Sequence, residues 1–163
     1  MRSAGASVLR AVRPVAVPFI ASRVLVLGAL LATRQLLDTL GVAGRPDSLL
    51  GWDAAWYRDL AAHGYGGVAA EALRFFPLFP MTARGLAVLP GVDAGLAVVL
   101  VANAAALGAL VALHALAIEV RGDEALARRA VWWMALAPPS FVLVMGYSEG
   151  CFLVVSVLTL LAL

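Results

Sequence analysis

AGLAVVLVANAAALGALVALHALAI, residues 94–118, is a run of 25 residues without a charged side chain. About 20 mainly apolar residues are enough for a helix to cross the roughly 30 Å hydrocarbon core of a bilayer. The rest of the 163-residue chain has the same character, because 63% of its residues are apolar and 13% are charged. A soluble domain carries roughly 25% charged residues. The composition therefore predicts an all-α polytopic integral membrane protein.

The remaining composition excludes several functional classes. One cysteine, Cys151, argues against a disulfide scaffold. The net charge is +2 and the largest basic cluster is the pair Arg128-Arg129, so nucleic acid is not an expected partner. The two histidines lie far apart and give no metal-ligand spacing, so we expect no metal and no cofactor. All 12 basic residues are arginine, a bias that indicates a bacterial, GC-rich genome.

Three further segments are apolar enough to be spans: residues 14–37, 131–146 and 151–163. Three arginines precede the first segment and Arg23 interrupts it, which favours an uncleaved span over a signal peptide. Pro138-Pro139 interrupts the second segment. The third has only 13 apolar residues, so we expect the chain to be the N-terminal part of a longer protein with a single membrane domain.

A long polar and aromatic stretch, residues 41–93, separates the first span from 94–118. Its segment 75–90 is short and carries Arg84 in the middle, which predicts an interfacial or re-entrant helix. The positive-inside rule places the arginine-rich N-terminus in the cytoplasm. Residues 41–93 then lie outside the cell, the loop 119–130 lies inside, and Glu149 lies outside. If 75–90 crosses the membrane instead, the loop 119–130 moves outside.

The motif WDAAWY, residues 52–57, lies in that expected outer loop. On a helix, Asp53 and Tyr57 share one face because they are four residues apart. A carboxylate beside aromatic rings at a membrane surface is partly desolvated, which raises its proton affinity and suits it to general-base catalysis. The alternative, which composition alone favours, is an interfacial aromatic belt with Asp53 as a helix N-cap.

The motif RFFPLFP, residues 74–80, contains two prolines that stop an ordinary helix from running through it. Exposed amides and Arg74 near the interface could hold a lipid phosphate, since arginine pairs with phosphate through two parallel hydrogen bonds. The alternative is a kinked interfacial anchor whose arginine extends its charged end to the water.

Polar residues also occur within or beside the apolar segments. Glu149, in the motif YSE, follows the span that Pro138-Pro139 should bend or break, and ionisable groups in such places are candidates for function. The alternative is a loop glutamate that faces water. Asn103 and His114 lie inside the longest apolar run, where such residues more often join helices through hydrogen bonds than take part in catalysis.

In chain order, these motifs resemble the N-terminal half of the PIG-V family, polytopic mannosyltransferases of the GT-C superfamily. The resemblance covers residues 22–163 and rests on SR (22–23), WDAAWY (52–57), HGY (63–65), RFFPLFP (74–80), VAN (101–103), APPSF (137–141) and YSE (147–149). Eukaryotic members add a mannose to the GPI-anchor precursor, and bacterial, actinobacterial-type members are common. Bacteria make no GPI anchor, so the family does not supply the acceptor.

The resemblance implies a GT-C-like bundle in the plasma membrane and an inverting enzyme. Such an enzyme moves mannose from polyprenyl-phosphate mannose to a glycan or lipid acceptor on the outer face. The family has a catalytic acidic residue in the first outer loop, and Asp53 is its match, while Glu149 would orient a substrate. The cations expected to neutralise the departing phosphate are Arg58, His63, Arg74 and Arg84. The aromatic residues expected to contact substrate are Trp52, Trp56, Tyr57 and Tyr147.

Two other classes of function remain open. A transporter or flippase of lipid-linked sugars would explain the prolines and the polar groups within the spans as parts of a pathway. A non-catalytic membrane partner would only pack against other spans. Against transport, the longest polar stretch is an aromatic-rich outer loop, rather than a set of charges at the middle of the membrane.

Overall fold

The computed structural model describes residues 4–42 and 48–163, and within these ranges every regular element is helical. Arg2 and residues 43–47 of the expected outer loop lie outside the described residues. In chain order the elements are α1 (Ala4–Thr39), η1 (Ser48–Leu50), α2 (Asp53–His63), η2 (Ala70–Arg74), α3 (Leu78–Leu86), α4 (Ala94–Arg121), α5 (Glu124–Leu136), η3 (Pro138–Leu143) and α6 (Glu149–Leu161), where η marks a short 3-10 helix. The all-α prediction is confirmed.

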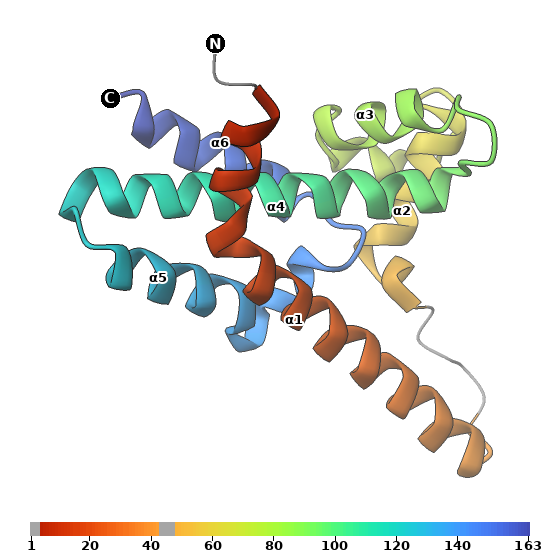
Figure 1. Ribbon diagram of the computed structural model, residues 1–163. Helices are drawn as coiled ribbons and strands as arrows, with labels where there is room; N and C mark the ends of the chain where they lie inside the picture. The colour runs from red at the N-terminus through yellow and green to blue at the C-terminus, as the bar shows by residue number, and fades with distance from the viewer. Residues whose placement is uncertain (1–3, 43–47) are drawn as a thin grey trace.

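The long helix α4 is the centre of the fold, and every other α-helix packs against it (Figure 1). Asp93 caps its N-terminus, because its carboxylate accepts a hydrogen bond from the backbone N–H of Leu96 at 2.8 Å. Gly122 caps its C-terminus with a positive φ of 63°, a conformation that glycine adopts at little cost. Helices α2 and α3 lie at the N-terminal end of α4, and α5 starts from the opposite end (Figure 1).

Among the described residues, two helices are long and apolar enough to cross a membrane: Ala11–Thr39 within α1, and Ala94–Arg121, which is α4. They contain the two spans predicted at 14–37 and 94–118. Most of the α1 surface is uncovered, and apolar side chains such as Val24 and Leu31 are each 64% exposed. Pro14 and Pro18 lie inside α1, and the helix bends in its N-terminal third (red in Figure 1), as expected where prolines remove backbone hydrogen bonds.

The segment 131–146 differs from the expected span because it does not form one helix. Helix α5 begins earlier, at Glu124, and ends at Leu136, and the next residues form η3. Pro138-Pro139 explains the break, since the residue before a proline is driven to an extended conformation, and Ala137 has φ −57° and ψ 147°. The expected loop 119–130 is mostly helical, with a tight turn between α4 and α5.

The segment 75–90 contains only a short helix. Helix α3 has nine residues, which corresponds to a length of about 13 Å at 1.5 Å per residue. That length is too short for α3 to cross a bilayer by itself. The last helix, α6, is apolar and has 13 residues.

A polar cluster joins α1, α4 and the end of η3. Arg23 donates to Oδ1 of Asn103 at 2.9 Å and to the carbonyl of Leu143 at 2.8 Å. The amide of Asn103 donates in turn to the carbonyl of Val144 at 3.0 Å. The prediction that Asn103 joins helices through hydrogen bonds is confirmed, and the backbone carbonyls released by the broken segment gain donors.

Candidate functional site

The motif WDAAWY forms the first turns of α2. Asp53 is the first residue of the helix, and the N-cap position falls on Trp52, so the alternative in which Asp53 caps the helix does not apply. Trp52 has φ 50°, the only positive φ of a non-glycine residue in the described part of the chain, and its side chain is 72% exposed. Such strain in a bulky residue often marks a functional position. Asp53 is exposed and forms no hydrogen bond or ion pair within the described residues.

The motif YSE lies at the start of α6. Ser148 occupies the N-cap position and Glu149 is the first helical residue. Tyr147 is buried, with 8% of its surface exposed, while Glu149 is exposed. Both motifs thus place a carboxylate in the first turn of a helix, where the partial positive charge of the backbone amides favours an anion.

Three hydrogen bonds join residues 49–57, which end with the first motif, to residues 146–148 at the start of the second, although the partners are more than 90 residues apart. The backbone N–H of Gly146 donates to the carbonyl of Leu49 at 2.9 Å. The hydroxyl groups of Tyr57 and Ser148 lie 2.8 Å apart. A third and longer contact, of 3.4 Å, runs from the hydroxyl of Tyr147 to the carbonyl of Gly51. The structure therefore brings Asp53 and Glu149 to one place.

Gly146 allows this close approach. A Cβ atom built on Gly146 would lie 2.7 Å from a methyl carbon of Val98 on α4 and 3.4 Å from the Cβ of Ala54 on α2. The chain after η3 can therefore lie directly against α2 and α4 only because this residue has no side chain.

The carboxylates of Asp53 and Glu149 are close enough to change the pKa values of neighbouring groups. Burial raises the pKa of the Tyr147 hydroxyl group, and the charges of Asp53 and then Glu149 raise it further. The pKa of the Glu149 carboxyl group is raised, first because neighbouring atoms partly desolvate it and then because Asp53 repels its charge. The pKa of Tyr57 is raised by burial, against the effect of its bond to Ser148. The site is a pair of carboxylates flanked by two buried tyrosines.

The motif RFFPLFP packs against α2 through its aromatic rings. Tyr57 makes edge-on contacts with Phe75 and Phe79, each with 4.8 Å between ring centres. Trp56 stacks on Phe75 at 6.5 Å. The guanidinium of Arg74 lies 5.9 Å from the ring centre of Trp56 and 5.0 Å from that of Phe75. These ring contacts leave the hydrogen-bond donors of Arg74 without a carboxylate partner among the described residues.

The other expected cations have local partners. Arg58 forms an ion pair with Asp59 at 3.1 Å. Nδ1 of His63 lies 3.2 Å from the carbonyl oxygen of Asp59. Arg84, from α3, donates to the last carbonyls of α2, those of Ala61 at 3.0 Å and Ala62 at 2.7 Å. Arg74 therefore differs from the other three cations, because its contacts are with aromatic rings and theirs are with carboxylate or carbonyl oxygens.

Two apolar grooves lie next to this site, one lined by Trp52, which precedes Asp53, and the other by Ser148, which precedes Glu149. The α1 groove, about 570 Å³, lies between α1 and α2 and is lined by Val26, Leu30, Trp52, Arg58 and Phe141 among others. The α6 groove, about 340 Å³, lies between the RFFPLFP motif and α6 and is lined by Tyr57, Arg74, Phe76, Ser148, Phe152 and Val155 among others. Each groove has one arginine among its lining residues.

Three residues that line the α6 groove, Ser148, Phe152 and Val155, were not predicted from the sequence to bind a substrate. Ser148, Phe152 and Val155 follow a spacing of three or four residues, so they lie along one face of α6. That spacing was visible in the sequence, but an apolar face of a helix does not reveal which groove it lines. No group of three or more His, Cys, Asp or Glu residues that could hold a metal ion occurs in the described ranges.

In comparisons with known proteins, no family model, no curated protein and no solved structure matches the chain.

Proposed function

We propose that the protein is an integral-membrane glycosyltransferase that transfers mannose from polyprenyl-phosphate mannose to an acceptor on the outer face of the plasma membrane. The membrane location is supported by the two helices of spanning length and by the uncovered apolar surface of α1. A helix that exposes so many large apolar side chains is stable in lipid, whereas in water it would aggregate.

One observation carries the proposal: Asp53 lies beside Glu149 at the junction of the two motifs, exposed and without a partner among the described residues. A general base must be free to accept a proton and must be reachable by the substrate. The nearby hydroxyl groups of Tyr57 and Tyr147 could position sugar hydroxyls beside it. The resemblance to the PIG-V family gives the same aspartate the catalytic role.

In the proposed reaction, Asp53 accepts the proton of the acceptor hydroxyl group. The hydroxyl oxygen attacks the anomeric carbon of mannose, and the bond between that carbon and the phosphate oxygen breaks. Polyprenyl phosphate departs with the electron pair, and the configuration at the anomeric carbon is inverted. The departing phosphate needs a nearby cation to stabilise its charge, and it needs no metal if an arginine supplies that cation.

Arg74 and the α6 groove are the proposed site of the donor. Arg74 lacks a carboxylate partner in the described part of the chain, whereas Arg58 in the α1 groove is already paired with Asp59. The α6 groove is otherwise apolar, with Phe76 and Phe152 along it, and suits a polyprenyl chain. The hydroxyl groups of Tyr57 and Ser148 connect this groove to the carboxylate pair.

The polar residues inside the bundle give little support to a transporter. Within the bundle, Arg23 donates to Oδ1 of Asn103 and to a backbone carbonyl, and the amide of Asn103 donates to backbone carbonyls. Such satisfied groups hold helices together and offer few free donors or acceptors to a moving solute.

The test is a transfer assay that separates bond formation from transport. Membranes from cells that express the protein, and matched membranes from cells that lack it, are supplied with polyprenyl-phosphate mannose radiolabelled in the sugar. We expect label to appear in a product that resists mild acid, because a glycoside survives the treatment that cleaves a polyprenyl-phosphate sugar. Label that crosses the bilayer and stays acid-labile would show transport instead. If the donor is neither consumed nor moved across the bilayer, the protein is not catalytic.

A further inference from the structure

A second polar site lies far from the carboxylate pair, in a cleft of about 790 Å³ between α1, α4 and α5. Arg13, Pro14 and Pro18 line it from α1, His114 lines it from α4, and Glu124, Arg128 and Trp132 line it from α5. Two arginines and one glutamate give this lining a net charge of +1 with the histidine neutral. The cleft is therefore suited to an anion.

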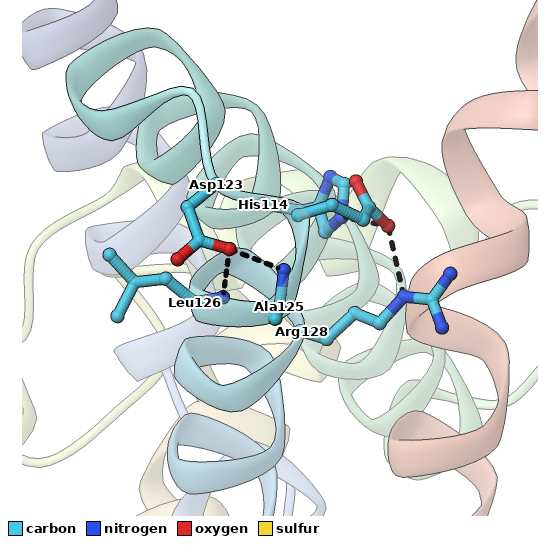
Figure 2. A network of polar contacts seen from close by, with 6 residues as sticks. His114, Asp123, Ala125, Leu126 and Arg128 are labelled. Atoms are coloured by element: carbon cyan, nitrogen blue, oxygen red, sulfur yellow. Dashed lines mark hydrogen bonds and ion pairs between the residues drawn. The ribbon is translucent and has the colours of Figure 1, made fainter.

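Several hydrogen-bond donors of the arginines in the cleft have no partner within the described residues. Arg128 donates through Nε to Glu124 at 2.9 Å, and its guanidinium extends toward α1 (Figure 2). This bond leaves the two terminal nitrogens of Arg128 without a hydrogen-bond partner in the part of the chain that the structure describes. Arg13 has no hydrogen bond or ion pair to any described residue. Two arginines are thus available to one ligand.

His114 supplies the second observation. Its Nε2 atom is buried and has no hydrogen-bond partner among the described residues, although it lies 3.4 Å from a carboxylate oxygen of Glu124. A buried polar atom without a partner costs free energy, so it usually has a ligand or a water molecule in the working protein. In the tautomer that carries the proton on Nε2, this atom is a donor that faces the same cleft.

We propose that this cleft binds a phosphate-bearing anion, with Arg13 and Arg128 as the charged donors and Nε2 of His114 as a third donor. Arginine suits this role because its planar group forms two parallel hydrogen bonds to phosphate oxygens. Glu124 does not prevent binding, because the two arginines together outweigh its single negative charge and the Nε bond to Glu124 at 2.9 Å leaves the terminal nitrogens of Arg128 for the ligand.

The position of the cleft makes an anionic lipid headgroup the expected ligand. Arg13 lies two residues after the start of the apolar stretch Ala11–Thr39, and His114 lies seven residues before the end of α4 at Arg121. Seven helical residues correspond to about 10 Å. The cleft therefore lies near the ends of both span-length helices, where headgroups meet acyl chains. Trp132 is 40% exposed beside it, as is usual for tryptophan at a membrane interface.

The test measures thermal unfolding of the purified, detergent-solubilised protein, because a ligand of the folded state raises the unfolding midpoint. Three probes are titrated: dihexanoyl phosphatidylglycerol, dihexanoyl phosphatidylcholine and inorganic phosphate. We expect phosphatidylglycerol to stabilise the protein and phosphatidylcholine, whose choline cation opposes the arginines, to do so much less. Arg13→Gln should weaken phosphatidylglycerol binding about ten- to a hundredfold, as expected for a lost charged hydrogen bond.

Arg129→Gln is the matched control, because Arg129 is an exposed arginine next to Arg128 that does not line the cleft. It should change the affinity by less than about twofold, because an exposed charge that does not contact the ligand is screened by salt. Arg13→Lys keeps the charge and should give an intermediate loss. The unliganded Arg13→Gln protein should unfold at the wild-type temperature, since Arg13 has no bond in the described structure.

The outcomes separate the sources of the phosphate and can overturn the site. If inorganic phosphate binds as tightly as phosphatidylglycerol and depends equally on Arg13, the site takes soluble phosphate. If only the lipid binds in this way, the site takes a headgroup. Equal effects of Arg13→Gln and Arg129→Gln, or equal binding of the two lipids, would mean that no built phosphate site exists.

Discussion

At the scale of single residues, the four cations near the first motif differ in what they bind, and this difference predicts different phenotypes. Arg74→Ala should lower kcat/KM for the polyprenyl-phosphate donor about ten- to a hundredfold, because it removes a charged hydrogen bond of about 1.5–3 kcal/mol. Arg84→Ala should instead lower the free energy of unfolding by about 1–2 kcal/mol, since it removes two bonds to carbonyls of α2. Donor titrations and thermal unfolding of both variants check this, and a donor defect in Arg84→Ala alone would reverse the assignment.

The raised pKa of Glu149 predicts a pH-dependent stability. A carboxyl group with a raised pKa favours the folded state while it is protonated and loses that contribution as it ionises. Relative to Glu149→Gln, the wild type should therefore become less stable as the pH rises from about 4 toward neutrality. Unfolding midpoints across this range measure the difference, and it should shrink in an Asp53→Asn background, because Asp53 contributes to the raised pKa. A difference that is the same at every pH would contradict the raised pKa, and a pH dependence unchanged by Asp53→Asn would contradict the proximity of Asp53 to Glu149.

Residue types indicated which side chains could carry chemistry, but they did not indicate their partners. The sequence pointed to Asp53, Arg74 and Glu149 from their motifs. It could not separate Arg74 from Arg84, because the partners of Arg84 are backbone carbonyls, and every residue carries a carbonyl. The role of Asn103 was predictable, since an amide in an apolar helix has few alternatives to bonding a neighbouring helix.

At the scale of elements, the contact between α4 and α6 depends on Gly150. A Cβ atom added at Gly150 would lie 2.9 Å from the carbonyl oxygen of Ala102 and 2.9 Å from the backbone nitrogen of Ala106. Gly150→Ala should push the helices apart and destabilise the protein by about 1–3 kcal/mol. Gly85→Ala is the control, because nothing lies within 4 Å of its added Cβ atom, and it should be neutral or slightly stabilising. Equal unfolding midpoints for the two variants would argue against this packing.

The positions of the long helices α1 and α4 were predictable from the sequence, but the structure of the segment 131–146 was not. Length and apolar composition define a spanning helix, so α1 and α4 include the predicted segments 14–37 and 94–118. The diproline at 138–139 indicated a break but not its form. The hydrogen bond from Gly146 to Leu49 could not be predicted, because a backbone contact between distant segments leaves no pattern in the local sequence.

At the scale of the whole molecule, the two proposed sites lie toward opposite ends of α4. Leu50 and Arg58 lie against Gly95 at one end, and His114 lies near Glu124 toward the other. Helix α4 has 28 residues, which corresponds to about 42 Å and is enough to cross a bilayer. This arrangement agrees with the proposed topology, in which the arginine-rich end is cytoplasmic.

Single cysteines at the two ends test that topology. In a Cys151→Ala background, a membrane-impermeant thiol reagent added outside intact cells should label Asp53→Cys and leave Arg128→Cys unlabelled. Both variants should react once the membrane is permeabilised. Labelling of both positions from the same side of the intact membrane would contradict the topology and, with it, the outer-face location of the proposed reaction.

The central claim, that Asp53 is the general base, is tested most directly by comparing mannose transfer in membranes with matched amounts of Asp53→Asn and Asp59→Asn. Asparagine has nearly the shape of aspartate, and Asp53 makes no hydrogen bond or ion pair with the described residues, so folding should survive. We expect Asp53→Asn to lose nearly all transfer. Asp53→Glu should recover little, because a shift of about an angstrom can cost about a hundredfold. Asp59, which is paired with Arg58, should tolerate the change with a mild loss. Equal transfer by the two asparagine variants would contradict the account and leave Asp53 with a structural role.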